Sequence, residues 1–199
     1  PVVLFNRSQD IEGITSISSD NVAGGRKVAE FLMAGGHRRI GYIAGWEGAS
    51  TQRDREAGFT AALHDAGQQV FSREVGDFDT ARAREAARAM FDKPADRRPD
   101  AVFVANDHMA FAVMDVLRFE LGIAVPGEVS VVGYDDVPPA AWPAYNLTTV
   151  RQRANLMVGE TVAALMDHID TPQTARPRRV AIDGPLILRG SARSPKDKG

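Results

Sequence analysis

The chain has no cysteine, only four histidines and almost no excess of either charge. Without cysteine there can be no disulfide framework and no thiolate metal site. None of the histidines forms a close pair at ligand spacing, so we expect neither a zinc site nor a cofactor. Lys and Arg total 24 against 26 Asp and Glu, and the formal charge of -2 excludes a global basic footprint for nucleic acid.

Long hydrophobic runs are also missing, and none approaches the length of a membrane span, so no membrane partner is expected. The chain opens without methionine, directly in an apolar segment at Pro1–Phe5, from which we expect that an upstream part is missing. The 199 residues are 44% apolar and 25% charged, as in an ordinary globular protein. That length suffices for one large domain or two small lobes.

Short apolar segments alternate with helical patterns at intervals of roughly 30 residues, the length of a βαβ unit. This alternation predicts an α/β fold with doubly wound, parallel sheets. The predicted strands are 2–5, 15–18, 40–44, 70–75, 101–105, one that ends just before Asp135, 147–151 and a broken pair within 179–188. The predicted helices are one capped by Asp20 that stops at Gly35, 53–66, 80–91, one capped by Asn106 or Asp107 that ends at Gly122, and 155–169.

Residues 101–136 read as strand, helix and strand, and each strand ends in two polar residues. Asn106 and Asp107 follow the first strand, whereas Asp135 and Asp136 follow the second. In a parallel sheet these ends share one edge, where open α/β sheets bind ligands. Adjacent strand residues point to opposite faces, which favours one acidic acceptor in the cleft over a pair of catalytic carboxylates.

Other polar and aromatic side chains are expected near the same edge. Arg53 and Arg55 fall in the first turn of a predicted helix, where a guanidinium would suit a carboxylate, a phosphate or sugar hydroxyls. The alternative is that both are solvated arginines paired with neighbouring acids. Phe78 and Trp46 lie in loops after strands, and each could either plug the core or offer a flat face to a ligand.

Catalytic motifs are not apparent. Ser50 lacks the flanking glycines of a nucleophile elbow, and the chain has neither a phosphate loop nor a GxGxxG motif. An enzyme acting on a small polar substrate has the least support, because no base–nucleophile pair can be identified. We therefore expect no catalytic residues.

Seven segments resemble the lactose-repressor-like (LacI/GalR) transcription regulators in order and spacing. The resemblance covers essentially the whole chain, and the most specific set is VANDHMA, VPGEVSVVGYDD and LTTVRQ. The remaining segments are SDNVAGGRKVAEFLMAGGHRRIGYIAG, REAGFTAAL, GDFD and LILRGSARSP.

The resemblance implies a periplasmic-binding-protein-like, effector-binding domain whose two lobes close on a small ligand. It implies an incomplete N-terminal lobe in residues 1–38 and 148–178, and a C-terminal lobe in residues 39–147 and 179–199. The family's helix-turn-helix DNA-binding domain is absent from this chain. The family's ligand contacts fall on Thr51, Arg55, Phe78, Asn106 and Asp135.

The resemblance also implies a homodimer formed largely through the C-terminal lobe. Phe111 and Trp142 are the candidate interface residues, as an exposed aromatic pair. Tyr145 departs from the family, which usually has proline there. The same comparison leaves Asp107 and Asp136 as a helix cap and a turn residue.

The expected function is that of the effector-binding and dimerisation region of a cytoplasmic, sugar-responsive repressor. A sugar or sugar derivative would bind between the lobes, and operator DNA would be bound by the missing N-terminal domain. The alternative is a periplasmic sugar-binding protein of an ABC transporter, which shares the fold. The tail LILRGSARSP resembles the repressor branch and favours the regulator.

Overall fold

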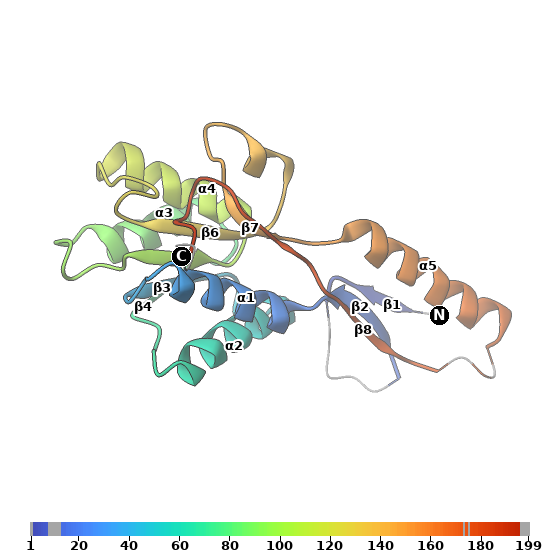
Figure 1. Ribbon diagram of the computed structural model, residues 1–199. Coiled ribbons are helices and arrows are strands. Elements are labelled where there is room, and N and C mark those ends of the chain that lie inside the picture. The colour runs from blue at the N-terminus through green and yellow to red at the C-terminus, as the bar shows by residue number, and fades with distance from the viewer. Residues whose placement is uncertain (1, 8–12, 173, 175, 196–199) are drawn as a thin grey trace.

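The computed structural model describes residues 2–7, 13–172, 174 and 176–195, which form two lobes of unequal size (Figure 1). Each lobe is built on its own sheet. The smaller sheet is parallel, in the order β1–β2–β8, with β1 at Val3–Phe5, β2 at Thr15–Ser19 and β8 at Arg179–Ile182. Helix α5 (Ala154–Asp170) covers one face of this sheet.

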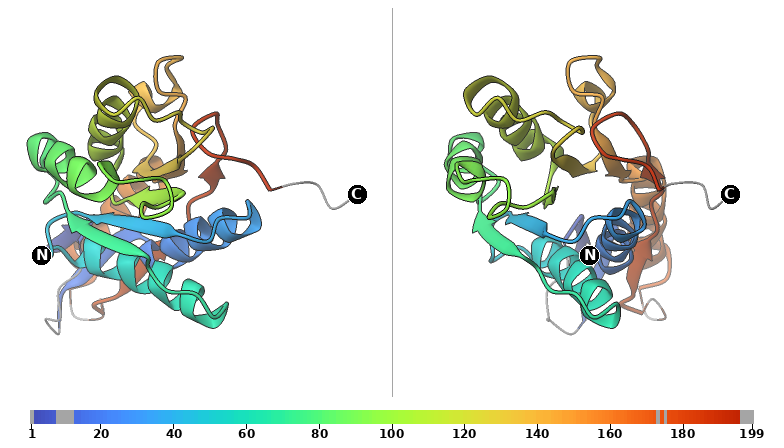
Figure 2. Two further views of the ribbon diagram at one scale, coloured as in Figure 1. Left: turned by 90° about the vertical axis from the view of Figure 1, so that its left-hand side faces the viewer. Right: turned by 60° about the vertical axis from the view of Figure 1, so that its left-hand side comes forward.

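The larger sheet has six strands in the order β4–β3–β5–β6–β7–β9, and only the short edge strand β9 runs antiparallel. Helices α1 and α2 cover one face, and α3 and α4 cover the other (Figures 1 and 2). The strands are β3 (Ile40–Ala44), β4 (Ser72–Val75), β5 (Ala101–Val104), β6 (Ser130–Asp135), β7 (Thr148–Arg151) and β9 (Leu186–Ile187). The helices are α1 (Asn21–Ala34), α2 (Ser50–Asp65), α3 (Thr80–Phe91) and α4 (Asp107–Asp115), the last continued by a π-helical turn η1 (Val116–Glu120).

Burial explains why the central strands carry no alternating pattern. Strands β3 and β5 are buried at every residue, as expected for parallel strands covered on both faces. Phe59 of α2 packs against Tyr42 and Phe103, with ring centroids 5.5 Å and 5.2 Å apart. The large lobe therefore holds almost all of the described core.

The small lobe has much less core. Its buried cluster consists of Ile17, Met157 and Ala164, with Val180 and Ile182 partly buried beside it. The outward side of α5 leaves apolar side chains exposed at Leu156, Val158, Val162, Met166 and Ile169. None of the described helices is both long and apolar enough to cross a membrane.

The chain passes between the lobes three times. It crosses from β2 to α1 at residues 19–21, from β7 to α5 at 151–153, and from β8 to β9 at 182–186. Asp20 N donates to the Ile182 carbonyl oxygen (2.9 Å), and Arg151 N donates to the Pro185 carbonyl oxygen (2.9 Å). Backbone hydrogen bonds thus join the third crossing to each of the other two.

The lobe boundaries differ from those expected from the sequence. Strand β8 pairs with β2, so residues 179–182 lie in the small lobe, although 179–199 were expected in the large one. Strand β7 pairs with β6, so residues 148–151 lie in the large sheet. Helix α1 packs on α2 rather than on the small sheet, because its glycines allow a close helix contact.

Candidate ligand-binding site between the lobes

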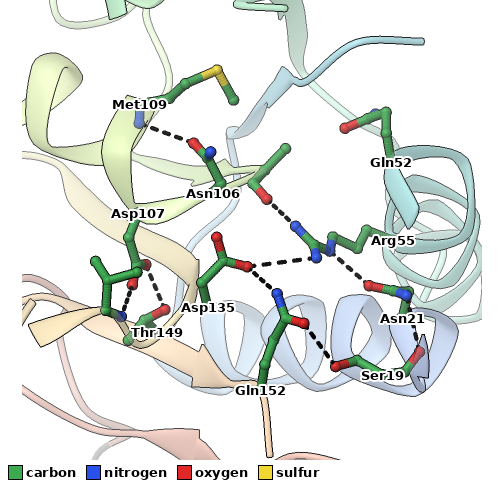
Figure 3. A network of polar contacts seen from close by, with 12 residues as sticks. Ser19, Asn21, Gln52, Arg55, Asn106, Asp107, Met109, Asp135, Thr149 and Gln152 are labelled. Carbon is green, nitrogen blue, oxygen red and sulfur yellow. Dashed lines mark hydrogen bonds and ion pairs between the residues drawn. The ribbon is translucent and has the colours of Figure 1, made fainter. Parts of the chain in front are cut away.

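Polar side chains from both lobes meet where the strands of the large sheet end (Figure 3). Asn106 follows β5, and Asp135 is the last residue of β6, which pairs with β5 in parallel. Both therefore lie at the edge predicted from the sequence. Arg55 approaches from α2, and Gln152 approaches from the second crossing.

Arg55 is a buried residue with 3% exposure, not a solvated arginine. Helix α2 begins at Ser50, earlier than predicted, so Arg55 lies in its second turn. The guanidinium stacks on the Tyr134 ring at 3.6 Å from the centroid and donates through Nη1 to the Ala105 carbonyl oxygen. Its Nη2 lies 3.6 Å from Asp135 Oδ1, an ion-pair distance. Arg53, by contrast, is exposed.

A closed ring of polar contacts joins the first two crossings to the large lobe (Figure 3). Ser19 Oγ donates to Gln152 Oε1 (3.1 Å), and Gln152 Nε2 donates to Asp135 Oδ1. Asp135 faces Arg55, whose Nε donates to Asn21 Oδ1 (2.8 Å). Asn21 Nδ2 then donates to the Ser19 carbonyl oxygen (2.9 Å), which completes the ring. A change at Asp135 would therefore alter polar contacts at both crossings.

Asn106, rather than Asp107, caps α4. Its Oδ1 accepts the Met109 N–H (2.9 Å), whereas no described residue accepts a hydrogen bond from its Nδ2. Asp107 was expected as a helix cap, and that expectation is wrong. Its fully buried carboxylate accepts hydrogen bonds from Thr149 Oγ1 (2.6 Å) and from the Val137 N–H (2.9 Å), because its side chain turns toward β7.

Asp136 points away from Asp135, as strand alternation predicts. Its carboxylate pairs with Arg151 Nε (2.6 Å) and with Arg189 Nη2 (2.7 Å). Asp135 and Asp136 both have positive φ, at 121° and 59°, so the chain turns sharply there. The Asp135 carboxylate thereby faces Arg55 and Gln152, and that of Asp136 anchors the segments beside it.

Burial governs the electrostatics of these acids. Desolvation raises the pKa of Asp135, while the Arg55 charge and the Gln152 hydrogen bond oppose that rise. Desolvation also raises the pKa of Asp107 to about 7, against the hydrogen bonds from Thr149 and Val137. The charges of Asp135 and Asp136 add to the latter rise.

Phe78 lies in the loop after β4, and Thr51 lies at the start of α2. Phe78 follows β4 with a positive φ of 58°, is 36% exposed, and covers Gly45, where an added Cβ would lie 2.2 Å from its ring. Thr51 is partly buried in the first turn of α2, and no described side chain or backbone group is hydrogen-bonded to its hydroxyl. Neither residue belongs to the closed ring.

The sequence analysis missed the polar residues at the crossings and on the inner side of α2. Ser19 is the last residue of β2 and Gln152 directly follows β7, so the rule that located Asn106 and Asp135 could have found them. Gln52, which is 1% exposed, holds the site loop by accepting from Gly45 N (2.7 Å) and Tyr42 Oη (3.1 Å). Asn6, after β1, has a buried Oδ1 without a partner among the described residues.

Only one residue of the aromatic pair expected on the surface is exposed. Trp142 is 56% exposed, but Phe111 is 8% exposed, so its expected exposure is wrong. The Tyr145 ring stacks on Phe111 at 4.3 Å and shields it. Phe119 of η1 is 80% exposed, and Arg118 beside it donates to the Ala144 carbonyl oxygen of the Trp142 loop.

The side chains of this site are suited to bind a polar ligand. A carboxylate, a guanidinium and an amide can hydrogen-bond several hydroxyl groups, and an aromatic ring can cover an apolar face. No group of three or more His, Asp or Glu side chains among the described residues is arranged to hold a metal ion. The site thus fits a small polyhydroxylated ligand.

Proteins of known identity are similar in sequence to this chain over nearly its full length. A family model described as a periplasmic binding protein-like domain matches residues 14–192. The HTH-type transcriptional regulator CelR of Thermobifida fusca is 37% identical over 182 residues, 90% of this chain and 52% of that protein. The ribose operon repressor of Escherichia coli (strain K12) is 32% identical, over 91% of this chain and 54% of that protein. The chain spans about half the length of these relatives.

Solved structures of regulators share the fold. A complex of transcriptional regulator CelR with cellobiose superposes with a TM-score of 0.87 at 35% identity, over 96% of this chain and 59% of that chain. A dimeric Lac repressor lacking 11 C-terminal residues superposes with a TM-score of 0.87 at 27% identity, over 98% of this chain and 70% of that chain. The chain belongs to the periplasmic-binding-protein-like family and, within it, to the effector-binding domains of the lactose-repressor-like (LacI/GalR) transcriptional regulators.

Proposed function

We propose that this chain is the effector-binding and dimerisation region of a sugar-responsive transcriptional repressor. The observation that carries the proposal is the cluster of Arg55, Asn106 and Asp135 at one sheet edge, between the lobes. Phe78 and Thr51 border that cluster and complete the proposed ligand-binding set. The ligand is a sugar or sugar derivative, as in the relative whose structure contains cellobiose.

Ligand binding acts through the ring of polar contacts. A ligand hydroxyl that donates to Asp135 Oδ1 competes with the Gln152 amide for the same oxygen. Loss of that bond loosens the second crossing from the large lobe and so changes the relative free energies of two lobe arrangements. A ligand shifts such an equilibrium only through its different affinity for the two states. Through the same coupling, ligand binding changes the affinity for operator DNA, which is bound by an N-terminal domain outside this chain.

The regulator is favoured over two other functions. A sugar-binding protein of a transporter has the same fold, but the relatives named above are transcriptional regulators. The same relatives argue against an enzyme. We place the full-length protein in the cytoplasm, where operator DNA lies, and infer that it forms a homodimer in which Trp142 contributes to the interface.

The first prediction concerns Asp135. Asp135→Asn keeps the size of the side chain but removes the charge that faces Arg55, so sugar affinity should fall at least about 100-fold, or about 2.7 kcal/mol. The full-length protein is first screened by thermal shift against monosaccharides and disaccharides, because a bound ligand raises Tm. Calorimetry with the best sugar then compares the variant with the wild type, and Asp96→Asn on the exposed surface serves as the control.

Each of three results would contradict one part of the proposal. If no sugar in the panel raises the Tm of the wild-type protein, the ligand is not a sugar. A variant that is folded by circular dichroism and binds the sugar with unchanged affinity would remove Asp135 from the site. A sugar that binds without changing operator affinity in a gel-shift assay would leave a binding domain without the proposed regulatory coupling.

A further inference from the structure

Trp46 is an aromatic side chain for which the ligand site described above has no role. It lies in the loop between β3 and α2 and is 49% exposed. Its ring rests on Gly48, where an added Cβ would lie 2.5 Å from the nearest ring atom. The indole is therefore seated on backbone rather than swinging freely, although half of its surface meets solvent.

A second aromatic ring is seated on the same loop in the same manner. Phe78 covers Gly45, three residues before Gly48. Three residues of extended chain span at most roughly 11 Å, so the two seats are neighbours. Gln52 holds the start of this loop by accepting the Gly45 N–H (2.7 Å). Two flat apolar surfaces are thus seated on neighbouring residues of this loop, and one of them, Phe78, already belongs to the proposed ligand set.

Trp46 faces the other lobe. Arg7, which follows β1 of the small lobe, has its guanidinium carbon 5.9 Å from the centroid of the Trp46 ring. That distance is near the outer limit of a cation–π contact, so the attraction is weak at an exposed position. The indole consequently lies at the opening between the lobes, opposite a cation that can donate to hydroxyl groups.

Building on the proposed function, we propose that Trp46 forms a second sugar subsite, so that the effector is an oligosaccharide of two or more pyranose rings. The first ring takes the polar site of Arg55, Asn106 and Asp135, with Phe78 against its apolar face. The second ring stacks on Trp46, and Arg7 donates to its hydroxyls. A pyranose ring suits such a surface because its C–H groups form an apolar face beside a polar rim.

A second sugar subsite explains why the Trp46 indole is left half exposed on a loop of the site, where its contact with water costs free energy. An exposed indole held over glycine on a site loop gains little by burial, and its weak contact with Arg7 does not bury it further. A stacked sugar ring would cover that face when the lobes close. If Trp46 only latched the lobes through Arg7, its removal would affect ligands of every length equally.

The experiment measures affinity by calorimetry on the full-length protein, with glucose, galactose, xylose and ribose, and with cellobiose, lactose, maltose and xylobiose. The tightest ligand should be a disaccharide. Trp46→Ala should weaken it at least about tenfold, or about 1.4 kcal/mol, and should change monosaccharide affinity less than twofold. Trp46→Phe keeps a flat ring and should recover most of the loss.

Phe71→Ala is the matched control, because Phe71 is 45% exposed but precedes β4, at the opposite end of the sheet. Fluorescence gives an independent readout, since Trp46 and Trp142 are the only tryptophans. The disaccharide should alter wild-type emission and leave that of Trp46→Phe unchanged.

A protein that binds none of these sugars would overturn the proposed function as a whole. One whose tightest ligand is a monosaccharide, or whose disaccharide affinity survives Trp46→Ala, would overturn the second subsite alone. An equal loss for monosaccharides and disaccharides in Trp46→Ala would also overturn it, in favour of a latch between the lobes.

Discussion

Asp107 is a fully buried carboxyl group held by two neutral donors, Thr149 Oγ1 and the Val137 N–H. Burial raises the pKa of Asp107 from the ordinary range of an aspartate to about 7. Between roughly pH 4 and 7 the folded protein therefore holds a proton that the unfolded chain has released. The free energy of unfolding should fall as pH rises through this window, because the native state binds more protons there.

We therefore predict that Asp107→Asn flattens the pH dependence of stability. The wild-type loss should reach at most about 1.4 kcal/mol per pH unit between pH 5 and 7, and the variant should lack this part. The asparagine can still accept from Val137 and donate to Thr149, so the fold should persist. Urea unfolding at pH 5, 6, 7 and 8 measures the effect. Identical pH slopes for both proteins would mean that Asp107 titrates normally.

Single residues differed in how far the sequence could place them. Asn106 and Asp135 could be placed because strand ends are local features and parallel strands share an edge. Arg55 was expected in the first turn of its helix, either at the ligand or in solvent, and its burial depends on Tyr134 and Asn21, which are remote in sequence. Phe111 was expected on the surface because nothing local reveals that Tyr145 covers it.

At the level of elements, α1 and α2 pack with almost no side-chain layer between them. An added Cβ at Gly25 would lie 2.1 Å from the Arg55 carbonyl oxygen, and one at Gly58 would lie 2.0 Å from that of Val22. This close approach sets the position of α2, and with it the position of Arg55. The sequence predicted both helices, but not that glycine would form their contact.

Gly58→Ala should therefore destabilise the protein by at least about 2 kcal/mol, because the added methyl group meets backbone that must shift. It should also weaken sugar binding, since Arg55 moves with α2. Gly159→Ala on α5 is the matched control, because nothing lies within 4 Å of its added Cβ. That substitution should stabilise the helix by about 0.5–1 kcal/mol. Urea denaturation of both variants makes the comparison, and equal stabilities would refute the close-contact account.

At the scale of the whole molecule, the alternating pattern predicted the doubly wound sheets, whereas the lobe boundaries depended on pairing between distant strands. Strand β8 pairs with β2, more than 150 residues earlier in the chain, and no local pattern encodes that choice. For the same reason, the ring between the crossings was not foreseen. Ser19 and Gln152 are 133 residues apart in sequence.

The proposed dimer also belongs to this scale. Trp142→Glu should weaken self-association of the full-length protein at least about tenfold, because a central aromatic contact is lost and a charge is introduced. Sedimentation velocity over a range of concentrations measures the change. Phe71→Glu, on an aromatic of comparable exposure elsewhere, should leave the association unchanged. A Trp142→Glu protein that dimerises like the wild type would place the interface elsewhere.

The three crossings have a mechanical consequence. The three chain segments are tied to one another by hydrogen bonds and so act as one hinge between the lobes. Such a hinge should let the lobes open about a single axis more readily than it lets them twist or slide. A ligand that pulls on both lobes should therefore mainly open or close them about this hinge. Arg7 and Trp46 lie on opposite lobes, so a small rotation at the hinge becomes a larger displacement between them.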